Sequence, residues 1–329
     1  QIAGITTYKG SGMTLPVGPT EMRGGRGRGV VAGGTQPSPV GNVNTMEFIE
    51  IATTGNATDF GDFNQSPYFG GTGFASATRG LFAGGYNPTA GITDIGFLTF
   101  SSNGGANDFG DMAFRRYYPY SLSDSTRGLI SGGKTNPADV NLYSIEFVTM
   151  ASTGDASGFG DMTDKKNWGA GVNSPTRGLF GGGRPLESNN SLYTNVIDFV
   201  TIQTKGDALD FGNLVAAAGA MDGCSSTTRG LWGAKYIGSY TAAIDFVTMA
   251  TFGNASDFGD LTRTVFGAGG MSNSIRGVWA GGQNPSNDPG MNIMDYVTIA
   301  TTGNAVDFGD LTAARGYVKG CSDTHGGLG

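Results

Sequence analysis

Carboxylate side chains recur along this sequence in one phrase, Asp-Phe-Gly-Asp, which returns at steps of about 50 residues. The copies are "TGNATDFGDF" from Thr54, "NGGANDFGDM" from Asn103, "TGDASGFGDM" from Thr153, "KGDALDFGNL" from Lys205, "FGNASDFGDL" from Phe252 and "TGNAVDFGDL" from Thr302. Such oxygens can coordinate a cation, pair with a base, or serve as the acid and base of a glycosidase. The remaining residues decide which chemistry is open to this chain.

A basic residue recurs with the same period, in the phrase Thr-Arg-Gly and its variants. These arginines are Arg28, Arg79, Arg127, Arg177, Arg229 and Arg276. We predict that each lies beside a repeated aspartate and forms charge-assisted hydrogen bonds with it. The predicted partners are Asp59, Asp62, Asp108, Asp111, Asp161, Asp210, Asp257, Asp260, Asp307 and Asp310. Calcium is the alternative ligand of "GNAxDFGD", although the phrase has neither the spacing of an EF-hand loop nor its bidentate Glu.

Catalytic chemistry finds little support in the residue types. A single histidine, His325, leaves no Ser-His-Asp triad and no multi-histidine metal site. A further acid recurs in a phrase such as "IEFVTM", at Glu47, Glu146, Asp198, Asp245 and Asp295. An active site needs a few special residues rather than one in each repeat, so we predict a structural role for these acids. We expect a non-enzymatic protein without a cofactor, and a carboxylate-only glycosidase is the less favoured alternative.

Each repeat contains four β-strand patterns bounded by turn residues. In order these are a variable stretch, the Arg-Gly phrase that ends in a Gly pair, the "IEFVTM" type of phrase with apolar residues on both faces, and the Asp-Phe-Gly-Asp phrase. Units of this kind and length, repeated radially, are typical of a β-propeller. Six continuous repeats are expected within a single domain, at 19–64, 65–112, 113–162, 163–213, 214–261 and 262–311.

The two ends of the chain are expected to complete one more blade. A step of 49 residues beyond Arg276 reaches His325, in a degenerate copy of the Arg-Gly phrase. Residues 312–329 would supply two strands, and residues 1–18 are long enough to supply the other two. A ring closed in this way would have seven blades, one of them composite.

The wording of the repeats resembles a known family. The order of a variable strand, "RGLFAGG", "IDFVT" and "DFGDL" is similar to the kelch repeat. The phrases "TTGNAVDFGDLT" and "TRGLFAGG" resemble kelch-like repeat proteins of tailed phages of marine bacteria. This resemblance implies a virion structural or fibre-type protein, on an exposed, extracellular appendage, without catalytic residues.

Composition narrows the class of partner. Charged residues make up 14% of the chain and the net charge is −7, which argues against binding to nucleic acid. No run of about 18 apolar residues is present, so we expect no membrane insertion. The expected partners are other virion proteins, a glycan of the host cell surface, or both.

Residues that differ between repeats are the candidates for binding. Strand alternation would place the loop between strands two and three and the loop between strand four and the next strand one on the same face of the ring. The aromatic candidates on that face are Tyr117, Tyr118, Tyr120, Trp168, Tyr193 and Tyr236. We predict recognition of a host-surface glycan or protein by this face. A purely structural or decoration module that contacts other virion proteins is the alternative.

Overall fold

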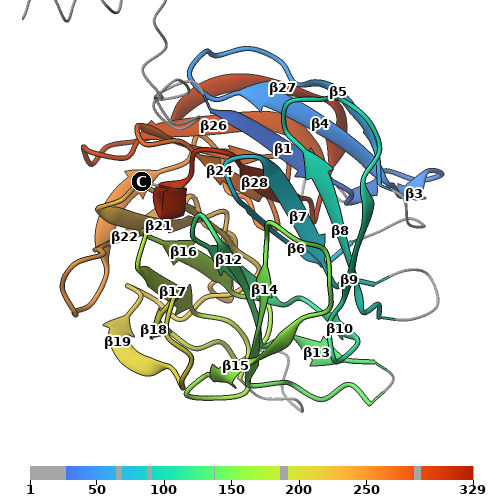
Figure 1. Ribbon diagram of the computed structural model, residues 1–329. Coiled ribbons are helices and arrows are strands. Elements are labelled where there is room, and N and C mark those ends of the chain that lie inside the picture. Colours follow the sequence, from blue (N-terminus) through green and yellow to red (C-terminus); the bar gives the residue numbers. More distant parts are fainter. Residues whose placement is uncertain are drawn as a thin grey trace, which may run out of the picture.

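The computed structural model describes residues 27–63, 69–86, 91–136, 138–185, 192–284 and 290–328. In these residues the chain folds into six four-stranded antiparallel sheets arranged radially as the blades of an all-β propeller (Figure 1). In each blade the strands lie side by side from the centre outwards, in the sequence order predicted from the repeats. None of the helices in these ranges is long and apolar enough to cross a membrane.

The blades are numbered 1 to 6 in chain order of their second strands. The innermost strands of blades 1 to 6 are β28 (Lys319–Ser322), β6 (Thr72–Ala75), β11 (Tyr120–Ser123), β16 (Ala170–Asn173), β20 (Asp222–Ser225) and β24 (Gly269–Ser272). The second strands are β1 (Arg28–Ala32), β7 (Arg79–Ala83), β12 (Arg127–Ser131), β17 (Arg177–Gly181), β21 (Arg229–Gly233) and β25 (Arg276–Ala280). The third strands are β4 (Thr45–Glu50), β8 (Asp94–Thr99), β14 (Ser144–Thr149), β18 (Val196–Thr201), β22 (Ala243–Thr248) and β26 (Met291–Thr298). The outer strands are β5 (Thr58–Asp62), β9 (Asn107–Asp111), β15 (Ser157–Asp161), β19 (Leu209–Asn213), β23 (Ser256–Asp260) and β27 (Val306–Arg315).

The remaining elements are short. They are β2 (Thr35–Gln36), β3 (Gly41–Asn42), β10 (Arg116–Tyr117), β13 (Lys134–Thr135) and a 3-10 helix at Gly326–Leu328. The pairs β2–β3 and β10–β13 are small two-stranded ladders in the loops.

The ring has six blades, and the prediction of seven was wrong. The C-terminal strand β28 pairs with β1 and becomes the innermost strand of the first blade, so no seventh blade forms (Figure 1). Asp323 Oδ1 accepts the N–H of Arg28 at 2.8 Å, just as Asp124 Oδ1 accepts that of Arg127 at 2.8 Å within blade 3. Arg28 therefore holds the position that the sequence pattern assigned to His325. Residues 1–18, the other half of the predicted closing blade, lie outside the described residues.

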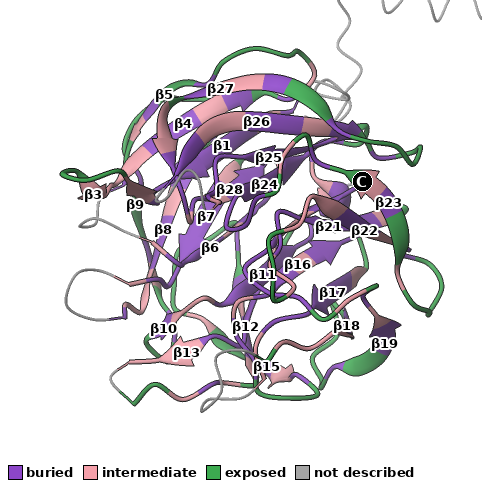
Figure 2. Cartoon of the chain, turned by 180° about the vertical axis from the view of Figure 1, so that it is seen from behind, coloured by how far each residue is buried: buried purple, intermediate pink, exposed green. Residues whose placement is uncertain are grey.

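Burial follows the position of each strand in its blade. In each second strand the first residue is half-buried and the rest are buried, whereas each outer strand begins with two exposed residues before a buried phenylalanine (Figure 2). Apolar side chains between neighbouring blades form six clusters, one at each blade boundary. The hydrophobic core is therefore a ring of inter-blade contacts, which stabilises the propeller only when all blades are in place.

The Asp-Phe-Gly-Asp phrase joins each outer strand to the next blade. Phe109 O of blade 2 accepts a hydrogen bond from Gly154 N at 2.7 Å, and Asp111 O accepts one from Ala156 N at 2.8 Å. Asp155 Oδ1, in the same turn of blade 3, accepts the N–H of Asp111 at 3.0 Å. The pair of backbone bonds recurs at all six blade boundaries. The repeated phrase is thus an inter-blade connection.

The Phe and the Gly of this phrase have separate roles. A register shift in the pairing of β14 with β15 directs Phe159 into the core, where it packs with Val200 of the next blade. Phe159 is thus the predicted wedge between blades. A Cβ atom on Gly160 would lie 2.2 Å from the carbonyl oxygen of Gly206 in that next blade, so only glycine fits there.

Each repeated arginine has a different partner from the predicted aspartate. Arg127 Nη1 donates to the carbonyl of Ile202 in blade 4 at 3.0 Å, and its guanidinium lies 4.6 Å from the centre of the Phe147 ring. Equivalent contacts to a carbonyl of the next blade and to an aromatic ring recur at the other five arginines. Among the described residues, the only ion pair of these six is that of Arg28 with Glu50. The arginines fold over the third strand, whereas aspartates such as Asp108 point into solvent.

Among the described residues, a buried ion pair links the third strand of five blades to a loop or another strand. Arg315 Nη2 lies 2.6 Å from Glu47 Oε1, with both side chains almost fully buried. The other pairs are Arg116–Glu146, Lys166–Asp198, Lys235–Asp245 and Arg263–Asp295. The five acids singled out from the sequence therefore have structural partners, and their predicted structural role is confirmed.

Blades 2 and 5 depart from this arrangement. Blade 2 has Gly96 in place of the acid, and a Cβ atom there would lie 2.9 Å from the ring of Phe63, which fills the space. In blade 5 the loop position of the base is Ala218, and Lys235 from the end of the second strand pairs with Asp245 at 2.5 Å instead. Burial lowers the pKa of Lys235 and raises that of Asp245, the direction expected for charges removed from water.

Candidate functional site: an aromatic cavity on one face of the ring

The two faces of the ring are built from different connections. The turn face carries the connections between strands one and two and between strands three and four, and the loop face carries the other two kinds. This follows from the antiparallel order within each blade. The loop face is the one on which the sequence predicted a binding surface.

A belt of residues with positive φ surrounds the centre of the loop face, each two residues before the start of an innermost strand. Its members are Gly70, Tyr118, Trp168, Ala220, Gly267 and Tyr317. Trp168 N donates to the carbonyl of Tyr118 at 2.9 Å, and Ala220 N donates to that of Trp168 at 2.6 Å. A bulky side chain at positive φ is uncommon and strained, and such strain is concentrated at functional sites. Here it occurs at three positions of one belt.

The aromatic members of the belt stack across the centre of the ring. The rings of Tyr118 and Trp168 are 4.8 Å apart at 27°, and those of Trp168 and Tyr317 are 6.3 Å apart at 24°. Trp168 enters blade 4 and Tyr317 enters blade 1, which lie opposite each other. The stack therefore crosses the propeller axis and covers the loop-face end of the central channel.

A cavity of about 320 Å³ opens beside this stack. Three members of the belt line it, and the small side chain of Ala220 leaves room between the larger ones of Trp168 and Tyr317. Its walls are Trp168, Arg184, Tyr193, Ala220, Tyr236, Gly238, Tyr240, Phe266 and Tyr317. The cavity thus depends on a difference between the repeats at the belt position.

The predicted binding residues divide into three groups. Trp168, Tyr193 and Tyr236 line the cavity, and the rings of the last two are 5.8 Å apart. Tyr118 stacks on Trp168, and its neighbour Tyr117 hydrogen-bonds through its hydroxyl to Asp139. Burial raises the pKa of both phenols.

Tyr120 does not belong to the surface. It lies in the innermost strand β11 with no exposed area, packs against Phe180 and donates its hydroxyl proton to the carbonyl of Gly182 at 2.8 Å. The sequence "YYPYS" gave no sign of the boundary between loop and strand. Tyr120 is therefore a core residue, and its assignment as a binding residue is corrected.

Four cavity residues were missed by the sequence interpretation. Arg184 and Tyr236 occupy the same position of their repeats, three residues after the end of the second strand. Comparison of the repeats at that position would have found Arg184. Phe266 and Tyr317 lie in the loops that enter blades 6 and 1, where Tyr317 was hidden in the incomplete last repeat. Tyr240, 37% exposed, has no repeat equivalent and carried no signal.

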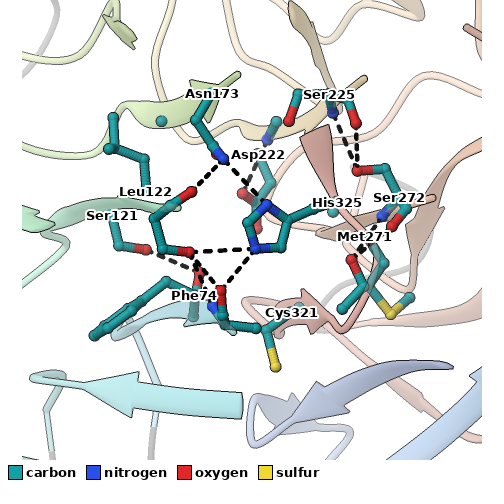
Figure 3. Close-up of a pocket in the computed structure, with 18 residues that line it drawn as sticks. Phe74, Ser121, Leu122, Asn173, Asp222, Ser225, Met271, Ser272, Cys321 and His325 are labelled. Carbon is teal, nitrogen blue, oxygen red and sulfur yellow. Dashed lines mark hydrogen bonds between the residues drawn. The ribbon is translucent and has the colours of Figure 1, made fainter. Parts of the chain in front are cut away.

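A second cavity lies in the central channel, where His325 from the C-terminal segment points among the innermost strands (Figure 3). His325 Nε2 donates to the carbonyl of Ala75 at 2.7 Å, while Nδ1 accepts from Asn173 Nδ2 at 3.0 Å and Gly327 N at 3.1 Å. Burial lowers the pKa of His325 to about 4, so the ring is neutral at pH 7. The remaining space is about 50 Å³, enough for ordered water but too small for an organic ligand.

Within the described ranges no three His, Cys, Asp or Glu side chains are close enough to hold a metal ion. Comparison with known proteins returns no significant match, either to a protein-family model or to a curated protein sequence. The chain is a six-bladed β-propeller, a fold consistent with a binding or a structural role.

Proposed function

We propose that this propeller is a non-enzymatic binding module that holds a sugar unit of a cell-surface glycan in the loop-face cavity. The observation that supports it is the cavity itself, an aromatic recess beside Ala220, where the belt carries a small side chain next to Trp168. Sugar rings have apolar faces that pack on Trp and Tyr rings and hydroxyl groups that bond to phenols.

The walls are suited to bind without rearrangement. Tyr236 contacts Tyr193, Tyr240 and Phe266 with ring centres 5.4–5.9 Å apart. Side chains held by such mutual contacts lose little freedom when a ligand enters, which favours affinity. A volume of about 320 Å³ is at the lower end of ligand pockets, which suits one unit of a longer saccharide chain.

The biological setting is proposed from the resemblance of the repeats to kelch-like proteins of tailed phages. In that setting the propeller belongs to an exposed appendage of the virion, and the loop face meets the surface of the host. The alternative is a decoration module whose loop face contacts another virion protein.

The test is binding of the purified protein to polysaccharide extracted from candidate host cells. Tyr236→Ala removes one cavity wall, while Tyr143→Ala removes a 43% exposed aromatic residue that does not line the cavity. We expect saturable binding of the parent protein and of Tyr143→Ala, and binding weaker by at least about tenfold for Tyr236→Ala. Equal binding by the two variants would contradict the cavity as the site, and no binding by any folded form would favour the decoration module.

A further inference from the structure

Arg184 holds an unusual position in the cavity wall. It is the only charged side chain among the lining residues. Its guanidinium lies 4.1 Å from the centre of the Trp168 ring and 5.1 Å from that of Tyr193, and Nη2 donates to the Tyr193 hydroxyl at 2.7 Å. The aromatic rings thus fix the plane and place of the cation.

Most donors of this guanidinium have no acceptor in the described part of the chain. A guanidinium carries five N–H donors, and Tyr193 takes one. Arg184 Nε is buried and has no hydrogen-bond partner there. A buried donor without an acceptor is costly, so a ligand that supplies an acceptor gains that free energy on binding.

The cations that pair with the acids of the third strands differ from Arg184. Arg116, Lys166, Lys235, Arg263 and Arg315 are each buried against a carboxylate of the third strand. Arg184 forms no ion pair with any described residue. These five cations therefore serve the fold, whereas Arg184 faces a ligand cavity.

Building on the proposed function, we infer that the cavity selects an anionic sugar unit, whose carboxylate or sulfate group pairs with Arg184 while its ring packs on Tyr236. The forked geometry of Arg suits the two oxygens of such groups. The net charge of −7 repels a polyanion as a whole. A preference for anionic saccharides would therefore report a local contact rather than general electrostatic attraction.

The test compares matched polymers on the folded full chain. Polygalacturonate is paired with its carboxyl-reduced product, and dextran sulfate with dextran, so that the two sources of negative charge are separated. We expect one of the anionic polymers to bind at least about tenfold more tightly than its neutral partner. Equal affinity within both pairs, with binding retained, would overturn the inference and leave the proposed function standing.

The variants locate the effect at one side chain. Arg184→Met keeps the length and packing of the side chain, and in this variant the anionic and the neutral polymer should bind with equal affinity. Arg184→Lys should recover part of the preference, because it restores charge without the fork. A preference that survives in Arg184→Met overturns the assignment to Arg184. Failure of the parent protein to bind these polymers and the host polysaccharide overturns the proposed function, and the inference with it.

Discussion

The two faces of the propeller use their residues in opposite ways. On the turn face the same residue types return in every blade, and each finds its partner in the backbone of the next blade, as Arg127 does at Ile202. On the loop face the residues differ from blade to blade, and where Trp168 is followed around the belt by Ala220 a cavity opens. Repetition therefore marks what closes the ring, and departure from it marks what can bind.

The buried ion pairs should give the largest effect on stability. Arg315→Met leaves Glu47 buried without its partner, and we expect the free energy of unfolding to fall by about 3–5 kcal/mol. Removing both charges, as in Arg315→Met with Glu47→Gln, should recover much of the loss. Denaturant unfolding of the three proteins measures this, and a loss below about 1 kcal/mol in the single variant would contradict the role of the pair.

The buried His325 in the central channel makes the stability of the protein depend on pH. The folded pKa of His325, about 4, is below the unfolded value of 6.5, so the unfolded state binds the proton first as pH falls. The contribution of neutral His325 to the free energy of unfolding is fully present above pH 6.5. It is lost as pH falls towards 4, and the total loss is about 3 kcal/mol. His325→Gln should lack this component. If unfolding free energies at pH 7 and pH 4 differ equally in both proteins, His325 is not buried as described.

The inter-blade contact of the repeated phrase can be tested within one strand. Gly160→Ala places a Cβ atom 2.2 Å from the Gly206 carbonyl oxygen, whereas Gly158→Ala, two residues away, meets nothing within 4 Å. We expect the first to cost about 1–3 kcal/mol and the second to change the free energy of unfolding by less than about 1 kcal/mol. Similar melting temperatures for the two variants would mean that the blades can separate at this contact.

The smallest effects distinguish the observed arginine contacts from the predicted ones. Arg79→Met removes the contact to the Phe97 ring and the bond to the Met150 carbonyl, with an expected loss of about 1–2 kcal/mol. Asp108→Asn, at an exposed predicted partner, should change stability by less than about 0.5 kcal/mol. Comparable losses in both variants, measured by thermal unfolding, would restore the Arg–Asp pairing.

The sequence was sufficient for the fold and the strand order, because period, turn residues and the two-faced apolar strands all repeat six times. It failed at the blade count, since His325 falls at the expected step from Arg276 although the chain has already turned into the channel. The partners of the arginines could not be predicted either, because a backbone carbonyl leaves no trace in the sequence. Tyr120 shows that residue type alone does not separate core from surface. Its neighbours Tyr117 and Tyr118 are also tyrosines, but they lie outside the innermost strand.

Tryptophan fluorescence offers the most direct test that ligands bind where the repeats differ. The chain has three Trp residues; Trp232 and Trp279 are fully buried, so iodide quenching reports on Trp168 in the cavity wall. The account predicts that a bound host polysaccharide protects the fluorescence from iodide, and that Trp168→Phe shows neither the quenching nor the protection. Saturable polysaccharide binding that leaves the quenching of Trp168 unchanged would contradict it.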